Sequence, residues 1–521
     1  MKEEKIIALT GASGNMGVKV TESLLSVPYI KLRILFLDTM KDRRLARKWQ
    51  KRYRNRIDTF FGNVGDISDC ERLVVNADYV INMAAVIPPQ ADHDHASSEE
   101  ANSKGVENIV KAVEKNGETK LVHISSVAIY GNRNYLHPWG RVGDPLLPSA
   151  YDVYAMAKLF GERAVLDSDI KNWVILRQTG ILYDKLLMNN VSDGLMFHTC
   201  FNTPIEWVTD VDTAKLIKNI ITQDVETPLG GFWNKVYNIG GGKNYRTTGY
   251  GTFNAGFALI GGGVEDFLRP EWQALRNFHC MWFEDGNVLE ERFHFRNSSL
   301  SEFWTGVAER NKYMKAAKFI PVSVIRKVVF ERLLKNSNAP LRWVRDGNYG
   351  RINAFYGSID NFYELKKGWE RFPLIEKGDK AFGDFDYEKA LDESKIAQNG
   401  YRLNHGFDEE KPISELDIRD MQRAAAFRGG ECLSTTMIKG DLYTKLKWRC
   451  SEGHEFYATP YAVLFAGHWC NECLSLYKWN FDALAKKNPF YAEVWYDSHE
   501  KKENYTYYFD ENGHALIKEG R

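Results

Sequence analysis

The sequence predicts an α/β fold whose first half is built on a doubly wound parallel sheet. An apolar run near the start ends in three glycines with the spacing G-x-x-G-x-x-G, and a helical pattern follows at once. Further apolar runs then alternate with helical patterns as far as residue 126. Strands that alternate with helices in this way form parallel sheets with helices packed on both faces.

The glycine-rich turn after the first strand, residues 5–10, predicts a site for a dinucleotide pyrophosphate. Gly11 makes the tight turn, Gly14 lets the backbone approach the phosphates without a Cβ, and Gly17 lets the helix pack on the strand. The first helical turn also offers free N–H groups and the positive end of the helix dipole to an anion. The residues expected to contact the cofactor here are Gly11, Ser13, Gly14, Asn15, Met16 and Gly17.

Two acidic residues predict where the adenosine half of the cofactor binds. Asp38 follows the apolar run 32–37 and can accept hydrogen bonds from both ribose hydroxyls, which favours NAD. NADP remains the alternative, because basic side chains just downstream could hold a 2′-phosphate: Lys41, Arg43 and Arg44. Asp66 follows the third apolar run and can receive the adenine amino group, while Ile67 lies against the ring.

The fourth and fifth apolar runs, residues 77–85 and 120–126, complete the predicted nucleotide-binding half. Small residues at the end of the fourth run, Ala84 and Ala85, let the backbone pass close to the cofactor. A helix over about residues 97–116 is expected to connect the two runs. The candidate catalytic side chains begin where the fifth run ends.

Ser126, Tyr154 and Lys158 form this candidate catalytic set. Tyr154 and Lys158 are four residues apart, so they share one face of a helix. A phenol has a reference pKa of about 10 and is a poor acid–base catalyst at neutral pH. A nearby ammonium favours the phenolate and brings that pKa toward the working range. The Ser126 hydroxyl can hold the substrate oxygen that exchanges the proton.

These motifs together resemble the extended short-chain dehydrogenase/reductase family of NAD-dependent epimerases, dehydratases and reductases. The resemblance covers about residues 5–240 and includes Gln178, which is expected near the cofactor. It implies a Rossmann-type fold, with Tyr154 as general acid/base and Ser126 polarising the substrate oxygen. It also implies that Lys158 binds the nicotinamide ribose. Ser125 is the less favoured serine, because the family's Ser/Thr usually stands four residues before a Tyr-Gly pair.

Departures from the family's patterns favour a ketone/alcohol oxidoreductase with a less charged substrate. Val127 and Ala128 stand where the dehydratases carry an acidic pair, which argues against a sugar dehydratase. The segment 176–183 lacks the Asn and Gly that sugar-nucleotide epimerases usually show. The segment 188–206 contains no Arg or Lys for a substrate diphosphate. An NAD-dependent sugar epimerase remains the alternative, and a non-catalytic NAD(P)-sensing protein is the alternative of another class.

The chain is long enough for three domains, predicted at residues 1–242, 243–403 and 404–521. The first is the NAD(P)-binding domain with the catalytic set. Toward its end, Asp210 and Asp212 are expected to cap the helix that follows them. The second is an aromatic-rich, mainly helical substrate lobe. Its aromatic side chains are expected to fill a core, with a few lining an apolar pocket.

The third predicted domain is a small zinc-binding module with its tail. Cys450 and His454 are followed by Cys470 and Cys473, a C-x3-H and C-x2-C spacing that suits tetrahedral Zn²⁺. With four protein ligands the site should be structural, and Cys432 is not expected to join it. The segment resembles small zinc-ribbon-type repeats, but its surroundings are not basic, so nucleic-acid binding is disfavoured.

The overall composition indicates a soluble globular protein, and the family resemblance implies a small-molecule substrate that carries a carbonyl or alcohol. Lys+Arg and Asp+Glu each number 69, so net charge gives no general attraction to nucleic acid or anionic membrane. No apolar segment of signal or transmembrane length is present. The seven cysteines do not form a disulfide framework, which fits a reducing cytoplasm. The family resemblance adds a homodimer as an expectation.

Overall fold

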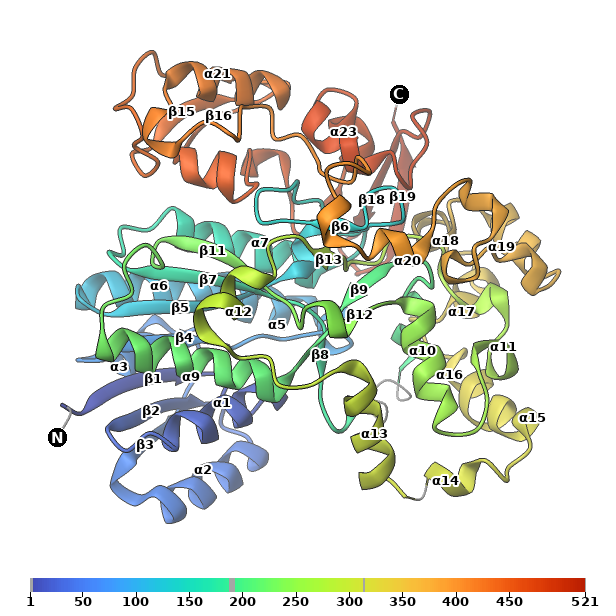
Figure 1. The fold of residues 1–521 in the computed structure, drawn as a ribbon, viewed down its shortest axis with the longest axis horizontal. Coiled ribbons are helices and arrows are strands. Elements are labelled where there is room, and N and C mark those ends of the chain that lie inside the picture. The colour runs from blue at the N-terminus through green and yellow to red at the C-terminus, as the bar shows by residue number, and fades with distance from the viewer. Residues whose placement is uncertain (1–2, 187–192, 313, 521) are drawn as a thin grey trace.

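A seven-stranded parallel sheet forms the centre of the computed structural model, which describes residues 3–186, 193–312 and 314–520 (Figure 1). The strand order is β11-β7-β5-β4-β1-β2-β3. The strands are β1 (Lys5–Thr10), β2 (Ile30–Phe36), β3 (Ile57–Phe61), β4 (Tyr79–Asn82), β5 (Lys120–Ser126), β7 (Trp173–Gln178) and β11 (Lys235–Ile239). The predicted Rossmann-type, doubly wound α/β fold is therefore confirmed.

Helices cover both faces of this sheet. One face carries α1 (Asn15–Leu25), α2 (Met40–Tyr53) and α9 (Asp210–Glu226). The other face carries α3 (Ile67–Val74), α6 (Gly105–Asn116) and α7 (Val153–Leu166). The helix expected over residues 97–116 is interrupted. It consists of α5 (His95–Glu99), a π-helical turn at Glu100–Lys104, and α6.

The start of α9 differs from the expectation. The Thr209 hydroxyl accepts a hydrogen bond from the backbone N–H of Asp212 at 3.0 Å, so Thr209 is the N-cap. Asp210 and Asp212 lie inside the first turn, where carboxylates favour the positive end of the helix dipole. The expectation that these two aspartates cap the helix was therefore wrong by one to three positions.

The region after residue 242 is mainly helical, as expected. Its helices are α10 (Gly249–Ala258), α11 (Val264–Phe267), α12 (Asn287–Phe293), α13 (Leu300–Arg310), α14 (Met314–Ala317), α15 (Val322–Ile325), α16 (Glu331–Leu333), α17 (Pro340–Arg345), α18 (Tyr349–Tyr356), α19 (Ile359–Leu365) and α20 (Tyr387–Ala390). Their aromatic side chains fill a core that continues into the C-terminal tail, where Trp479 and Phe490 are fully buried.

Short strand pairs tie this helical region to the sheet domain. The pairs are β6 (Trp139–Gly140) with β13 (Trp282–Phe283), and β9 (Pro204–Glu206) with β12 (Arg246–Thr248). A third pair, β8 (Ile181–Leu182) with β10 (Val208–Thr209), lies within the sheet domain itself. None of the helices in the described ranges combines the length and apolar character needed to cross a membrane.

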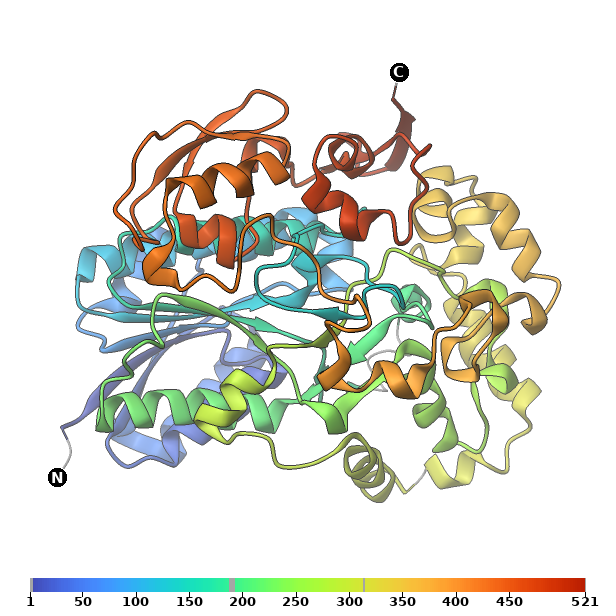
Figure 2. The ribbon, with the colours of Figure 1, turned by 45° about the horizontal axis from the view of Figure 1, so that its top comes forward.

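The C-terminal residues form two small antiparallel sheets with three helices. The elements are α21 (Ile418–Phe427), β14 (Glu431–Cys432), β15 (Leu446–Arg449), β16 (Glu455–Ala458), β17 (Lys478–Trp479), α22 (Phe481–Ala485), α23 (Pro489–Trp495), β18 (Tyr505–Phe509) and β19 (Ala515–Glu519). Figure 2 shows the first group of these elements lying over the sheet domain and the second beside the helical region.

A π-helical turn at Tyr461–Phe465 completes the cover of the central sheet over β7 and β11. The Tyr461 ring lies 6.1 Å from that of Trp173 in β7, and its hydroxyl accepts a hydrogen bond from the Val236 N–H of β11 at 2.8 Å. Val463 and Leu464 are fully buried there. Parallel strands are stable only with both faces covered. Residues 461–465 therefore belong to the same hydrophobic core as the sheet.

Candidate functional site

The glycine turn joins β1 to α1 at the carboxyl end of the sheet. Gly11 has φ +68°, and a Cβ there would lie 2.5 Å from the backbone of Met83. A Cβ on Gly17 would lie 2.1 Å from the Gly11 carbonyl oxygen, whereas one on Gly14 would make ordinary contact at 3.4 Å. Within the described ranges no side chain caps α1, so no side chain competes with an anion for its first N–H groups. This geometry suits a bound anion.

A cleft of about 690 Å³ lies at the carboxyl ends of β2 and β3 and brings together the residues predicted for adenosine. Its lining includes Asp38, Asp66 and Ile67. The Asp38 carboxylate is paired with the Arg43 guanidinium, one of whose N–H groups reaches it at 2.7 Å and lowers the pKa of the carboxyl. Asp66 also caps α3, accepting the Ser68 N–H at 2.8 Å. Both acidic residues therefore face the cleft while holding the local structure.

The other predicted cofactor residues lie along the carboxyl ends of β4 and β7. The Ala84 N–H donates to the Thr10 hydroxyl at 3.0 Å, and Ala85 follows it in the same extended segment. The Gln178 amide is largely buried and accepts a hydrogen bond from Thr213 at 3.2 Å. In the segment 188–206, residues 188–192 lie outside the described part of the chain.

The structure brings Ser126, Tyr154 and Lys158 together where β5 meets α7. Asp152 caps α7, its carboxylate accepting the Ala155 N–H at 2.8 Å, and this fixes the helix start. The Ser126 side chain lies close enough to the Tyr154 phenol to lower the pKa of that phenol. The Lys158 ammonium is buried one turn further along and donates to the Ile124 carbonyl of β5 at 3.0 Å.

The pKa values of this set differ from the expectation. Burial raises the pKa of Tyr154 to about 12, and the nearby Ser126 side chain only partly offsets this. Burial lowers the pKa of Lys158 to about 8, opposed by the nearby carboxylate of Glu162. The expectation that the Lys158 ammonium lowers the phenol pKa was therefore wrong for this structure. Its ammonium is directed to a backbone carbonyl, and desolvation of the phenol dominates.

A buried polar cluster beneath this set was not expected from the sequence. We call it the Glu162 cluster, and it consists of Ser125, Glu162, Arg177 and His468. The Ser125 hydroxyl donates to Glu162 at 2.6 Å, Arg177 forms an ion pair with it at 2.5 Å, and a ring nitrogen of His468 bonds it at 3.0 Å. The only sequence signal was the position of Glu162, four residues after Lys158 and thus on the same helix face.

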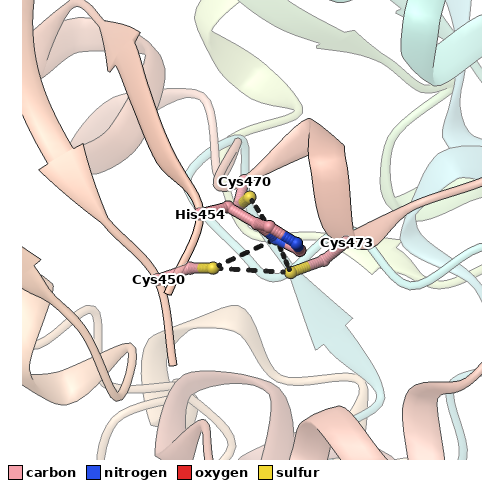
Figure 3. Close-up of side chains that lie close together, drawn as sticks. All are labelled: Cys450, His454, Cys470 and Cys473. Atoms are coloured by element: carbon pink, nitrogen blue, oxygen red, sulfur yellow. Dashed lines mark hydrogen bonds between the residues drawn. The ribbon is translucent and has the colours of Figure 1, made fainter. Parts of the chain in front are cut away.

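The four predicted metal ligands converge at the loops of the β15–β16 hairpin (Figure 3). The His454 Nδ1 lies 3.5, 3.7 and 3.4 Å from the sulfur atoms of Cys450, Cys470 and Cys473. The sulfur atoms of Cys450 and Cys473 are 3.6 Å apart. A tetrahedral Zn²⁺ with bonds of about 2.3 Å to sulfur and 2.0 Å to nitrogen has ligand–ligand edges of roughly 3.5–3.8 Å. Cys432 lies outside this group.

Comparison with known proteins finds one family of enzymes whose model matches part of the chain. Residues 7–177, less than half of the chain, match the model of the NAD dependent epimerase/dehydratase family. This description agrees with the prediction that the chain is an NAD-dependent enzyme. No curated protein matches the chain.

Solved structures of similar fold include two enzymes described with NAD. DesIV, a dTDP-glucose 4,6-dehydratase from Streptomyces venezuelae, is 18% identical with a TM-score of 0.48, covering 60% of this chain and 100% of that chain. The UDP-glucuronic acid 4-epimerase from Bacillus cereus, in complex with UDP-glucuronic acid and NAD, is 17% identical with a TM-score of 0.47. That match covers 60% of this chain and 99% of the epimerase.

Proposed function

We propose that the chain is an NAD(P)-dependent oxidoreductase of the extended short-chain dehydrogenase/reductase type, acting on a carbonyl or alcohol. The observation that carries the proposal is that Ser126 at the end of β5 lies close enough to the Tyr154 phenol of α7 to lower its pKa, with Lys158 one turn along the same helix. This set stands at the carboxyl end of a parallel sheet, where α/β proteins bind their ligands. The glycine turn of β1 lies at the same end of the sheet.

The protonation states of the set suit carbonyl reduction. With a pKa of about 12, the Tyr154 phenol is protonated at neutral pH, so it can donate its proton to the carbonyl oxygen of a substrate. A nicotinamide bound at this site would supply or accept the hydride at the carbon. Ser126 orients the same oxygen, and Lys158, with a pKa of about 8, is positively charged at neutral pH and would hold the nicotinamide ribose.

The preferred cofactor in this proposal is NAD, held by the glycine turn, Asp38 and the Asp66–Ile67 pair. A carboxylate at the ribose repels a 2′-phosphate, which supports NAD over NADP. NADP remains the alternative cofactor. Arg43, which pairs with Asp38 in this structure, can bind the 2′-phosphate of NADP once that pair is broken.

The C-terminal cluster of Cys450, His454, Cys470 and Cys473 is proposed to hold a structural Zn²⁺. The distances between the ligand atoms agree with the edges of a zinc tetrahedron, and four protein ligands leave no position for a reacting water. Bound zinc would then contribute to the folding free energy of this region.

A nucleotide-sugar epimerase is the second candidate, and the family match supports it equally. An epimerase oxidises and re-reduces one bound substrate, so it retains its cofactor through the cycle. A reductase exchanges the cofactor at each turnover. Purified protein that carries tightly bound NAD⁺ therefore favours the epimerase, and freely exchanging NAD(P)H favours the reductase.

The test is a screen of carbonyl compounds, alcohols and nucleotide sugars, followed by NADH and NADPH absorbance and by product analysis. On any substrate found, Tyr154→Phe should abolish turnover while NADH still binds, because only the transferable proton is lost. Tyr363→Phe, at an exposed tyrosine in α19, is the matched control. Unchanged turnover in Tyr154→Phe would remove Tyr154 from the reaction. Turnover lost equally in both variants would show that the effect is not specific.

A further inference from the structure

The Glu162 carboxylate links three parts of the chain that are distant in sequence. It belongs to α7, accepts a hydrogen bond from Ser125 of β5, and pairs with Arg177 of β7. The third partner, His468, comes from the C-terminal region and is 1% exposed. Glu162 and Arg177 are fully buried, so each polar contact replaces water that neither group can reach.

This cluster touches the candidate catalytic set at two points. Ser125 is the residue directly before Ser126, so its hydrogen bond to Glu162 holds the end of β5 against α7. Glu162 lies one turn after Lys158, and its negative charge stabilises the Lys158 ammonium against burial. A displacement of the Glu162 carboxylate would therefore reach both Ser126 and Lys158.

The C-terminal region holds the cluster in place through several bonds. The Ala466 carbonyl accepts from Arg177 at 2.7 Å, and the Trp469 carbonyl accepts from Arg163 of α7 at 3.0 Å. In sequence, His468 lies between Ala466 and Trp469 and two residues before Cys470. The cysteine–histidine cluster therefore helps to hold the segment that carries His468. A buried carboxylate that loses one of its partners keeps its charge but loses a hydrogen bond, which is costly.

We propose that His468 is a positioning residue for the active site, acting through Glu162 on Ser126 and Lys158. The C-terminal region is then a working part of the catalytic site and not a separate binding module. The effect of His468 on turnover rests on the proposed function, whereas its effect on the structure of β5 and α7 does not.

The experiment compares three full-length variants. His468→Leu removes the donor to Glu162, and His468→Gln retains a donor of similar reach. Tyr443→Phe is the control, because it removes another hydrogen bond between the C-terminal region and the sheet, that of Tyr443 to the Asn234 carbonyl at 2.8 Å. The measurements are hydrogen–deuterium exchange of residues 120–130 and 153–166, NADH affinity, and kcat and KM on the substrate found by the screen.

We expect His468→Leu to speed exchange in both segments and to lower kcat by about tenfold or more. KM and NADH affinity should stay within about twofold, since the adenosine cleft is built from other elements. His468→Gln should restore part of the loss, and Tyr443→Phe should behave as wild type. If His468→Leu does not fold, the exchange rates of His468→Gln and Tyr443→Phe are compared instead. Faster exchange in His468→Gln supports the proposal, and equal exchange overturns it.

Unchanged exchange in both segments for both His468 variants would overturn the proposal. Equal effects in Tyr443→Phe would also overturn it, because any loosening of the C-terminal region would then suffice. If no substrate is turned over, the exchange measurement still decides the role of His468. A failure to find any substrate would count against the proposed function alone.

Discussion

Alanine substitutions at Gly14 and Gly17 should separate cofactor binding from folding. At Gly14, φ is −69° and an added Cβ would make ordinary contact with the Gly11 carbonyl at 3.4 Å. The free energy of unfolding of Gly14→Ala should therefore change by no more than about 1 kcal/mol, the scale of an N-cap substitution. The methyl group would nevertheless occupy the space through which the pyrophosphate approaches. NADH affinity should fall by about tenfold or more, or about 1.4 kcal/mol.

Gly17→Ala should affect both properties. Its Cβ would lie 2.1 Å from the Gly11 oxygen and 2.8 Å from the Ala12 Cα, both of which are rigid backbone atoms. To restore ordinary contact α1 must retreat by about 1.3 Å, an overpacking change that costs roughly 1–3 kcal/mol. The same retreat moves the helix N-terminus away from the phosphates, so NADH affinity should fall as well.

The assays are urea unfolding followed by tryptophan fluorescence and NADH titration followed by cofactor fluorescence. Gly230→Ala is the control, because a Cβ there meets no atom within 4 Å in the described structure and its φ is not positive. If Gly14→Ala binds NADH as tightly as wild type, the pyrophosphate does not pass over this turn. If Gly17→Ala is as stable as the control, the close contact between α1 and the turn does not exist in solution.

Three further predictions concern charge and metal. Asp144 is buried against Arg133 and His405, which together outweigh its burial and lower its pKa from 3.8 to about 2. Asp144→Asn should therefore cost at least about 2 kcal/mol of unfolding free energy at pH 7. Because a lowered pKa stabilises only above the unfolded value, the difference should fade as the pH drops from about 4 to 2, and a pH-independent urea midpoint difference would contradict this. Asp38→Asn should raise the affinity for NADPH relative to NADH, as it frees Arg43 and removes the repelling carboxylate; an unchanged ratio in fluorescence titrations would place the ribose elsewhere. Cys470→Ser should lower both the zinc content and the thermal stability, measured by mass spectrometry and calorimetry, and retention of both would remove the metal assignment.

The sheet domain could be predicted closely because its signals are local. The strand predicted at residues 120–126 has those bounds in the structure, and the glycine turn leads into a helix at Asn15. The spacing of the cysteines and the histidine likewise predicted, without knowledge of the fold, that these four side chains lie together. In each case the residues that interact are neighbours in sequence, or their spacing alone predicts that they lie together.

The contacts across the chain could not be predicted in this way. Nothing in the pattern around His468 indicates a partner 306 positions away in α7. The Tyr154 pKa depends on how deeply the phenol is enclosed, and one sequence does not reveal that depth. Asp210 and Asp212 were misplaced as caps because Thr209 offers an equally good cap one position earlier. Pairings between distant segments and degrees of burial belong to the packed structure alone.

The cover that Tyr461–Phe465 provides over β7 and β11 has a consequence for how this chain is made. Arg177, at the end of β7, leaves the ribosome 289 residues before its acceptor Ala466. Until then the apolar side of Trp173 and the backbone of β11 lack their final neighbours. Contacts of such long sequence separation form slowly and leave apolar surface open meanwhile. A nascent chain that stops short of residue 461 would therefore carry an unfinished sheet and be a natural target for chaperones.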